Sequence, residues 1–473
     1  MTQQRAGLPC GRGPSALSSP PVRRASALVS AAVLAAVVLG APAARANGRF
    51  PEANQIAFTA QDPDLILLRV TFGLLISRDR GKTFEWVCEQ SIGFSGVEDP
   101  MYAVTPSKAI VGTTFQGLTI SRDGACGWSF AGGDLENQVF IDLSASPTDA
   151  KDIVVYASSY DKQGEDGGIL FTSRVWETKD EAQTFEQLGP ALDPTLLGYT
   201  IDLTATDPQR IYLTAVRDPG VAPKGVLLVS KDRGKTWTEE PVPLVDTERA
   251  VFVAAVDPTN AERVYLRTSN TADKPTRLIL REAGPDGGAP TQRTVHTAEG
   301  ALLGFALSPD GQKVYVGGPK DGVSVASTQD FAFQRRSNIE AQCLALSSDG
   351  LWACSNERSG FIAGLSTDDG ATFEPRLRFC DIRGPLAACG PGTPTNALCT
   401  NVWPSQKAML GCGGADAGAT GDGGFGDAGG GFAPPPRTEN CDCHASPAGP
   451  WGALVSVVGG AIALLRRSRR RRT

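Results

Sequence analysis

The 473-residue sequence predicts an all-β fold built from repeats, and two independent repeats point to it. One is a motif S-x-D-x-G-x-T followed by an aromatic residue, which recurs at long intervals. The other is an apolar strand that ends in a Pro or Asp turn and lies upstream of each motif. Short apolar and β-branched runs separated by Gly, Pro, Asn and Asp fill the units, and no amphipathic helical window competes with them. Four strands per unit and seven units predict a seven-bladed β-propeller over residues 47–379, whose radial blades expose only short sheet edges.

Each position of the first repeat has a local chemical reason. The Asp carboxylate accepts backbone N–H bonds across a tight turn, the Gly supplies a positive φ, and the aromatic residue starts the next strand. We therefore interpret the motif as a turn that fastens a β-hairpin. Three copies are complete, and they consist of Ser77, Asp79, Gly81, Thr83 and Phe84; of Ser230, Asp232, Gly234, Thr236 and Trp237; and of Ser366, Asp368, Gly370, Thr372 and Phe373. Three weaker copies contain Asp123, Asp180 and Asp330.

The upstream strands give an independent count of the blades. Seven of them occur, at 56–63, 101–106, 141–147, 201–208, 251–258, 305–309 and 343–349. The fifth unit has no legible motif, because its strand at 278–282 runs directly into the Gly- and Pro-rich 283–290. We interpret it as a blade that has lost the residues of the repeated turn.

The motif resembles the Asp box, or BNR repeat, of sialidases, sortilin-type receptors, photosystem assembly factors and xyloglucanases. The resemblance implies the fold rather than an activity. Sialidases also carry an Arg-Ile-Pro segment, an Arg triad and a Tyr and Glu pair, whereas this sequence has no Arg-Ile-Pro and only seven Tyr. We therefore expect no sialidase activity.

The first 46 residues have the three-part form of a secretory signal peptide. Arg23 and Arg24 precede a mostly apolar run at 27–40, and Ala44-Arg45-Ala46 follows it. Cleavage after Ala46 is expected, so that the mature, exported chain begins at Asn47.

The net charge and the cysteine content indicate which partners and which compartment suit this chain. Residues 47–410 carry 33 basic and 46 acidic residues, a formal charge of −13. Affinity for nucleic acid comes mainly from Lys and Arg that neutralise phosphates, so this domain is a poor candidate for it. Loss of Cys10 with the signal peptide leaves ten Cys, an even number that indicates disulfides formed in an oxidising compartment.

The cysteines suggest specific pairs. Cys343 and Cys354 flank a hairpin symmetrically and are expected to form a disulfide on neighbouring strands. Cys88 and Cys126 are candidates to meet at the outer edge of the first two blades. Four more, which are Cys380, Cys389, Cys399 and Cys412, suggest a separate cap with two disulfides over residues 380–412. A zinc site is the alternative, but the spacings are wide and no C-x-x-C occurs, so neither a metal nor another cofactor is expected.

The C-terminal part predicts a tether and a membrane-associated tail. Residues 413–440 are mostly Gly, Ala, Asp and Pro and predict a flexible linker without a core. Residues 441–473 contain Cys441 and Cys443, an apolar stretch at 451–465 and a terminal Arg cluster. As a helix the apolar stretch spans about 22 Å, against a hydrocarbon core of about 30 Å.

This tail resembles the MYXO-CTERM sorting domain of myxobacteria and related bacteria. The resemblance implies delivery to the cell surface, with Cys441 or Cys443 as the processed residue. The alternative is a single transmembrane anchor with its Arg cluster in the cytoplasm.

The sequence contains few residues that could carry out catalysis. Only two His occur, His296 and His444, and we interpret both as surface residues rather than as parts of a triad or a zinc site. One pair of carboxylates stands out, because Asp142 and Asp202 fall at equivalent places, each within an Ile-Asp-Leu triplet near the start of the inner strand in the third and fourth blades. Strand packing would separate them by about 10 Å, near the upper end of the range for inverting glycosidases. The alternative is that each accepts backbone N–H bonds from a neighbouring segment.

We therefore expect a monomeric, non-enzymatic propeller at the cell surface that presents a rim for binding a protein or a glycan. The alternative is a carbohydrate-active hydrolase that uses Asp142 and Asp202. Trp176, Trp352 and Trp403 are candidates for stacking on sugar rings, although an aromatic residue in a propeller more often packs between blades.

Overall fold

The computed structural model describes residues 50–59, 61–95, 98–164, 168–219, 222–271 and 274–412. The expected signal peptide, linker and tail, with Ala46, Cys441, Cys443 and His444, lie outside these residues. Within the described ranges, no helix has both the length and the apolar character needed to span a bilayer.

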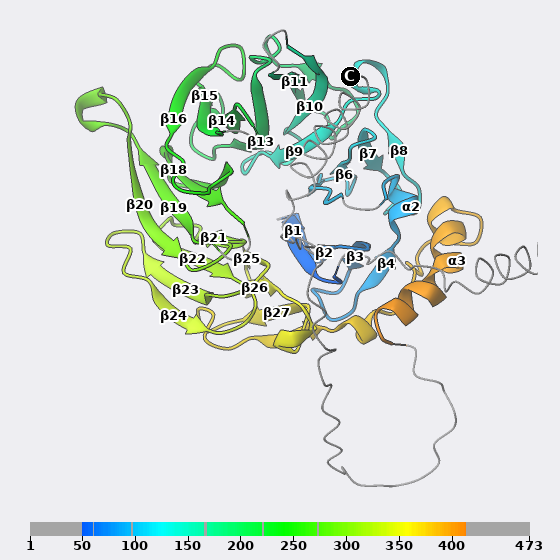
Figure 1. The fold of residues 1–473 in the computed structure, drawn as a ribbon. Helices are drawn as coiled ribbons and strands as arrows, with labels where there is room; N and C mark the ends of the chain where they lie inside the picture. The colour runs from blue at the N-terminus through cyan, green and yellow to red at the C-terminus, as the bar shows by residue number, and fades with distance from the viewer. Residues whose placement is uncertain are drawn as a thin grey trace, which may run out of the picture. The chain divides into compact units, whose positions relative to one another are not determined.

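Seven four-stranded antiparallel sheets form a ring, as Figure 1 shows, and this confirms the predicted seven-bladed β-propeller. The four strands of every sheet pair in chain order. Blades 1 to 3 contain β1 (Ala53–Thr59), β2 (Asp62–Val70), β3 (Gly73–Ser77) and β4 (Glu85–Val87); β5 (Tyr102–Val104), β6 (Ile110–Thr113), β7 (Leu118–Ser121) and β8 (Ser129–Phe130); and β9 (Phe140–Ala145), β10 (Ile153–Gln163), β11 (Ile169–Thr178) and β12 (Glu186–Gln187). Blades 4 and 5 contain β13 (Leu196–Leu203), β14 (Ile211–Arg217), β15 (Lys224–Ser230) and β16 (Thr238–Val242), and β17 (Ala250–Asp257), β18 (Asn260–Ser269), β19 (Thr276–Glu282) and β20 (Thr291–Ala298). Blades 6 and 7 contain β21 (Gly304–Leu307), β22 (Lys313–Gly318), β23 (Gly322–Ser327) and β24 (Gln334–Ser337), and β25 (Cys343–Ser347), β26 (Gly350–Cys354), β27 (Ala363–Ser366) and β28 (Glu374–Leu377).

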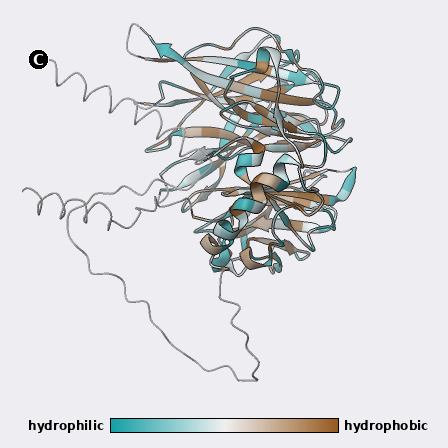
Figure 2. Ribbon diagram, turned by 90° about the vertical axis from the view of Figure 1, so that its right-hand side faces the viewer, coloured by the Kyte–Doolittle hydropathy of each residue, from teal (hydrophilic) through white to brown (hydrophobic). Residues whose placement is uncertain are grey.

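The hydrophobic core is divided among the spaces between blades. One cluster joins Val154 of blade 3 to Leu213 of blade 4, and others join the remaining neighbours in the same way. Since a blade is covered on both faces, its middle strands read as continuous apolar runs, and residues 211–216 of β14 are all buried. Figure 2 shows the hydrophobic stretches along the strands and hydrophilic ones at the hairpin ends. Each blade therefore depends on its neighbours to bury its apolar surface.

The repeated turns connect the third and fourth strands and have the hydrogen bonds that the sequence predicts. In blades 1, 3, 4 and 7 the Asp Oδ1 accepts the backbone N–H of the Thr four residues later at 2.9 Å. The Thr hydroxyl donates to the other carboxylate oxygen at 2.5–2.7 Å. These donors, the backbone N–H of Thr372 foremost, lower the pKa of Asp368 to about 2. In blade 2 Asp123 accepts from Cys126 and Gly127, whereas in blade 6 Asp330 accepts only from Ala332.

A long C-terminal segment lies against the outer edge of the first two blades. This segment, residues 378–412, is called the clasp below and contains η4 (Phe379–Asp381) and α3 (Pro394–Met409). It pairs in parallel with β4, where the Trp86 N–H donates to the Gly384 carbonyl at 2.7 Å and the Leu386 N–H to the Trp86 carbonyl at 3.0 Å. The helix α3 then lies beside α2 (Glu89–Ile92) and β4 (Figure 1). Thr393 caps α3 and Pro394 occupies its first turn, both of which are helix-start signals.

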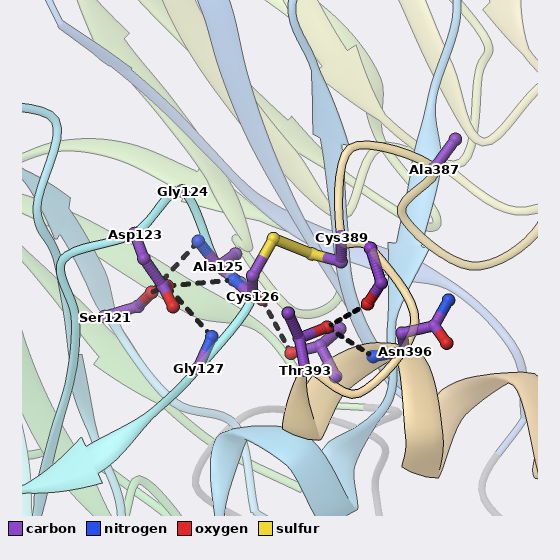
Figure 3. Close-up of a disulfide and its surroundings, with 12 residues drawn as sticks. Ser121, Asp123, Gly124, Ala125, Cys126, Gly127, Ala387, Cys389, Thr393 and Asn396 are labelled. Atoms are coloured by element: carbon purple, nitrogen blue, oxygen red, sulfur yellow. Dashed lines mark hydrogen bonds between the residues drawn. A yellow bond between two sulfur atoms is a disulfide. The ribbon is translucent and has the colours of Figure 1, made fainter.

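Four disulfides occur in the described chain. Cys343 bonds to Cys354 across β25 and β26, which is the pair that the hairpin symmetry predicts. The predicted pairing of Cys88 with Cys126 is wrong, because Cys88 bonds to Cys399 and Cys126 bonds to Cys389. Figure 3 shows the second of these bonds beside the turn of blade 2. Cys380 bonds to Cys412 within the clasp, so only one of the two disulfides expected inside the cap is present.

The physical reason for the difference is the path of the clasp. The sequence suggests a separate cap because Pro and Gly lie between its cysteines. Pairing with β4 instead carries residues 384–386 along the outer edge of blade 1, and this brings Cys399 to Cys88 and Cys389 to Cys126. A sequence does not encode such long-range contacts in its spacing.

Candidate functional site

The inner strands of the ring form the candidate site, because Asp142 and Asp202 lie on two of them, β9 and β13 (Figure 1). The pairing of the hairpins gives the height of each residue along a blade. We call each pair of facing residues on the first and second strands of a blade a rung. Rung 1 contains the second-strand residue that also pairs, on its other side, with the first residue of the repeated turn. These rung-1 residues are Ile66, Ile110, Ile153, Ile211 and Leu351 in blades 1, 2, 3, 4 and 7.

Asp142 and Asp202 do not occupy equivalent positions. Asp142 pairs with Tyr156 and lies on rung 4 of blade 3, whereas Asp202 pairs with Tyr212 and lies on rung 2 of blade 4. Rung 4 of blade 4 is Thr200. The equivalence inferred from the two Ile-Asp-Leu triplets is therefore wrong by two residues, since the hairpin turn and not the triplet sets the register.

The inner strands are joined by one repeated hydrogen bond. A backbone N–H on one inner strand donates to a rung-4 side chain of the preceding blade. The Ile201 N–H donates to Asp142 Oδ2 at 2.9 Å, and the Val253 N–H donates to Thr200 Oγ1 at 2.8 Å. In blade 1 the rung-4 residue is Gln55, whose Oε1 accepts the Tyr102 N–H at 3.3 Å. Asp142 thus does the same structural work as a Thr and a Gln at the same height.

The environment of Asp142 disfavours its charged form. The residue is 4 % exposed. Burial raises the pKa of Asp142 to about 7, although the backbone N–H of Ile201 and the charges of Arg69 and Arg267 act in the opposite direction. The hydrogen bond and the burial agree with the structural alternative that the sequence leaves open.

Asp202 lies among small side chains. Rung 2 of the other blades with a repeated turn carries Ala57, Ala103, Ser144 and Ala345. Asp202 is half-buried, and its carboxyl accepts no hydrogen bond from the described part of the chain. Burial inside the ring, with the nearby charge of Asp142, raises the pKa of Asp202 well above its ordinary value.

Two arginines accompany these carboxyls on the second strands. Arg69 is buried and donates to Asn54 Oδ1 at 2.7 Å and to the Asp99 carbonyl at 3.0 Å. Arg267 lies over the Phe252 ring, 4.6 Å from its centroid, and burial lowers the pKa of its guanidinium to about 10. Both guanidinium groups favour the charged form of Asp142, against the effect of its burial.

The other candidate residues are packed in the interior. Trp352 is 1 % exposed and donates to Ser347 Oγ, and Trp176 is buried. Trp403 of the clasp is half-buried with its ring 5.3 Å from that of Trp86. His296 is half-buried against Phe333, so its assignment to the surface is wrong in part, and burial lowers its pKa.

Sequence reasoning missed the role of the fourth residue of each repeated turn. This residue has a positive φ of 58–62° at Arg80, Glu181, Arg233 and Asp369, and the fifth residue is also left-handed. In each case its side chain bonds to the preceding blade. Arg233 contacts Asp152 and Glu177 at 2.5 Å, and Asp369 accepts from Tyr315 and Lys313. A charged residue directly before the Gly of the motif is the signal that identifies these contacts.

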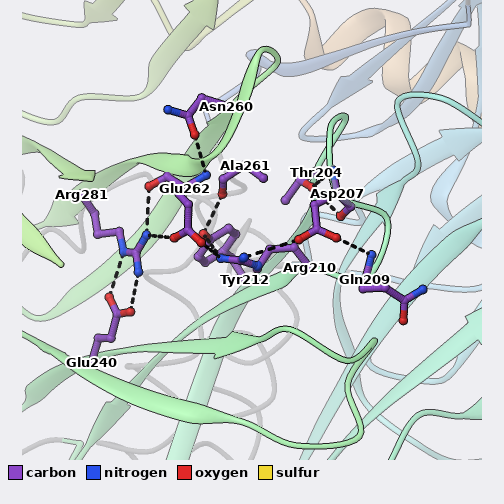
Figure 4. A network of polar contacts seen from close by, with 10 residues as sticks. All are labelled: Thr204, Asp207, Gln209, Arg210, Tyr212, Glu240, Asn260, Ala261, Glu262 and Arg281. Atoms are coloured by element: carbon purple, nitrogen blue, oxygen red, sulfur yellow. Dashed lines mark hydrogen bonds and ion pairs between the residues drawn. The ribbon is translucent and has the colours of Figure 1, made fainter. Parts of the chain in front are cut away.

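Blade 5 lacks the repeated turn and joins blade 4 through ion pairs, which Figure 4 shows. Arg281 is 3 % exposed and binds Glu240 at 2.6 Å and Glu262 at 2.8 Å. Glu262 also binds Arg210 of blade 4 at 2.6 Å. The network connects the two blades and leaves Arg281 fully engaged with structural partners.

Two cavities are lined by neither Asp142 nor Asp202. One of about 580 Å³ lies between blades 6 and 7 and is lined by Asp310, Lys313 and Tyr315, among others. The other, of about 390 Å³, lies between blades 2 and 3 beside Arg122 and Phe130. Among the residues that the structure describes, no group of three or more His, Cys, Asp or Glu is placed to bind a metal ion.

Comparison with known proteins identifies the fold. The chain is similar to the crystal structure of an ancestral GH74 enzyme, with a TM-score of 0.50, 14% identity and coverage of 69% of this chain. It spans only 46% of the length of that enzyme. The structure of YCF48 bound to a D1 peptide is also similar, at a TM-score of 0.37 and 16% identity, with 59% of this chain and 82% of that chain covered. No family model and no curated protein sequence matches the chain. At these identities the likeness shows the β-propeller fold alone.

Proposed function

We propose that this protein is a non-enzymatic β-propeller that presents a rim for binding a protein or a glycan at the cell surface. One observation carries the proposal, which is the hydrogen bond from the Ile201 N–H to Asp142 Oδ2. This hydrogen bond joins two blades, and it occupies the carboxyl group that is the best candidate for catalysis. A general acid or base must reach the substrate, and Asp142 is 4 % exposed.

The equivalent residues support the same conclusion. Thr200 and Gln55 accept the same kind of bond, and neither side chain acts as an acid or a base at ordinary pH. At rung 4 the hydrogen bond between blades requires an acceptor atom but no charged group. The repeated turns, which resemble Asp boxes, fit a rigid scaffold whose connecting loops are available for binding.

The anchoring part of the proposal comes from the sequence. The signal peptide, the linker at 413–440 and the MYXO-CTERM-like tail together suggest export and attachment at the cell envelope. The acidic charge of the propeller argues against nucleic acid as the partner.

A hydrolase remains the second candidate because of one observation. Burial keeps Asp202 protonated well above the ordinary pKa of a carboxyl group, and a general acid needs this property. In that case Asp202 acts as the acid and Asp142 as the base.

A glycan array and a polysaccharide hydrolysis screen on the same purified protein test both candidates. We expect retention on a ligand without turnover, and an Asp202→Asn variant that binds like wild type. Turnover that tracks with the protein and is lost in Asp202→Asn but kept in Thr200→Val favours the hydrolase and overturns the non-enzymatic proposal.

The anchoring is tested by replacing both Cys441 and Cys443 with Ser. We expect the full-length variant to stay in the inner membrane, while the wild type loses its tail and reaches the surface. Identical fractionation and identical gel mobility of the two proteins favour a plain transmembrane anchor.

A further inference from the structure

The seam between blade 7 and blade 1 is where this ring has to close. Many closed rings of sheets complete one blade with strands from both ends of the chain, but here blade 1 contains only β1–β4 and blade 7 only β25–β28. The first and last blades are therefore joined without any exchange of strands.

Two direct polar contacts across this seam are weak. On the inner side the Ala53 N–H donates to the Ser355 carbonyl at 3.4 Å, which is long for a backbone hydrogen bond. On the turn side Arg80 contacts Asp349 at 3.3 Å, and their side chains are 44% and 38% exposed. The corresponding contact between blades 3 and 4 uses Arg233, which is only 7 % exposed.

The clasp crosses this seam. It continues directly from β28 of blade 7 and adds the parallel pairing with β4 of blade 1. Phe379 packs edge to face on Phe72 with ring centroids 5.9 Å apart. Phe379, Ile382 and Cys399 belong to the same buried cluster as residues of blades 1 and 7.

Two disulfides link the clasp covalently to blades 1 and 2. Cys399 bonds to Cys88 at the end of blade 1, and Cys389 bonds to Cys126 in the turn of blade 2. Around them, the Thr395 hydroxyl donates to the Ala125 carbonyl at 2.7 Å. The bonds close sequence separations of 311 and 263 residues, whereas Cys343–Cys354 closes 11. In the chain-entropy model, longer loops restrict the unfolded chain more strongly.

We propose that the clasp closes the ring in place of strand exchange, and that this closure requires Cys88–Cys399 and Cys126–Cys389 to be oxidised. Reduction of each bond takes two electrons and two protons and yields two thiols. A dithiol reductant supplies both as it closes to a cyclic disulfide. In the reduced protein the seam opens first, while blades 3 to 5 keep their contacts.

Hydrogen exchange on the full chain tests the proposal. The clasp variant carries Ser at all four of these cysteines, and the matched control is Cys343→Ser with Cys354→Ser, which removes a disulfide inside blade 7. We expect amides of β1 and β25–β28 to exchange roughly tenfold faster in the clasp variant, with β13–β16 unchanged, because local opening follows the weakest interface. The control leaves the exchange of β1 unchanged.

Either of two outcomes overturns the proposal. One is wild-type exchange at β1 in the clasp variant, and the other is equal acceleration in all seven blades. If the clasp variant is not recovered folded, native wild-type protein is reduced with dithiothreitol and its thiols are counted by alkylation. Faster exchange at β1 must then appear together with alkylation of Cys88 and Cys399, and unchanged exchange after their alkylation overturns the proposal as well.

Discussion

Replacing Asp142 with Asn separates the structural role of this residue from a role for its charge. Asn keeps an acceptor for the Ile201 N–H, which Asp142 now accepts at 2.9 Å, and it does not ionise. The folded pKa of about 7 lies above the ordinary value of 3.8, so the folded state binds a proton more tightly than the unfolded chain. The stability that comes from this proton is complete below pH 4 and is lost as the pH rises to about 7.

The expected size follows from that difference. A shift of this size is equivalent to roughly 4 kcal/mol of unfolding free energy, as an upper value. We therefore expect wild type and Asp142→Asn to be nearly equal in stability at pH 4. The variant is more stable by up to roughly 4 kcal/mol at pH 8. Since both proteins share all other titrating groups, the difference between them isolates Asp142.

Chemical unfolding with the disulfides intact, from pH 4 to pH 8, measures this difference. Thr200→Val is the control, because it removes the equivalent hydrogen bond between blades 4 and 5 and involves no titrating group. It leaves the Val253 N–H without its acceptor and costs about 1–3 kcal/mol at every pH. A difference between wild type and Asp142→Asn that stays constant, or that favours wild type as the pH rises, shows that the carboxylate is charged in the folded protein and refutes the argument.

Two further predictions concern the repeated turns. Gly81→Ala places a Cβ 2.4 Å from the Trp352 ring, whereas the Gly234→Ala Cβ meets its nearest atom at 3.0 Å and has nearly the same φ. Overpacking therefore makes Gly81→Ala about 1–3 kcal/mol more costly in thermal unfolding, and equal losses contradict this. Arg233→Met leaves the half-buried Asp152 without its ion pair and the buried Glu177 with the exposed Lys179 as its remaining partner, and costs about 3–5 kcal/mol. Arg80→Met at the same turn position costs less than about 1 kcal/mol because its partners are exposed. Similar losses of unfolding free energy in the two Arg variants would show that burial does not decide the contribution of this contact.

The seven blades were predictable because their causes are local. An Asp that fastens a turn, a left-handed Gly and an apolar strand each follow from a few neighbouring residues, and they recur often enough to be counted. The hairpin disulfide Cys343–Cys354 was predictable for the same reason, since both residues belong to one β-hairpin.

The failures have non-local causes. The register of Asp202 depends on where the β13–β14 hairpin turns, and the Ile-Asp-Leu triplet that contains Asp202 does not show this. The partners of Cys88 and Cys126 depend on the path of the clasp, more than 260 residues later in the chain. The helix α3 was not predicted, although Thr393 and Pro394 are helix-start signals, because only its docking against blades 1 and 2 distinguishes it from the expected small cap.

The Cys380–Cys412 disulfide also decides how tension enters this domain. A pull on the chain beyond Cys412 passes through the sulfur atoms to Cys380, next to the last strand of blade 7. The 32-residue span between the two cysteines, which includes α3, then bears no load along its backbone. Under the proposed anchoring through the tail, a force on a bound ligand therefore reaches the propeller at the last strand of blade 7 and does not stretch the backbone of α3.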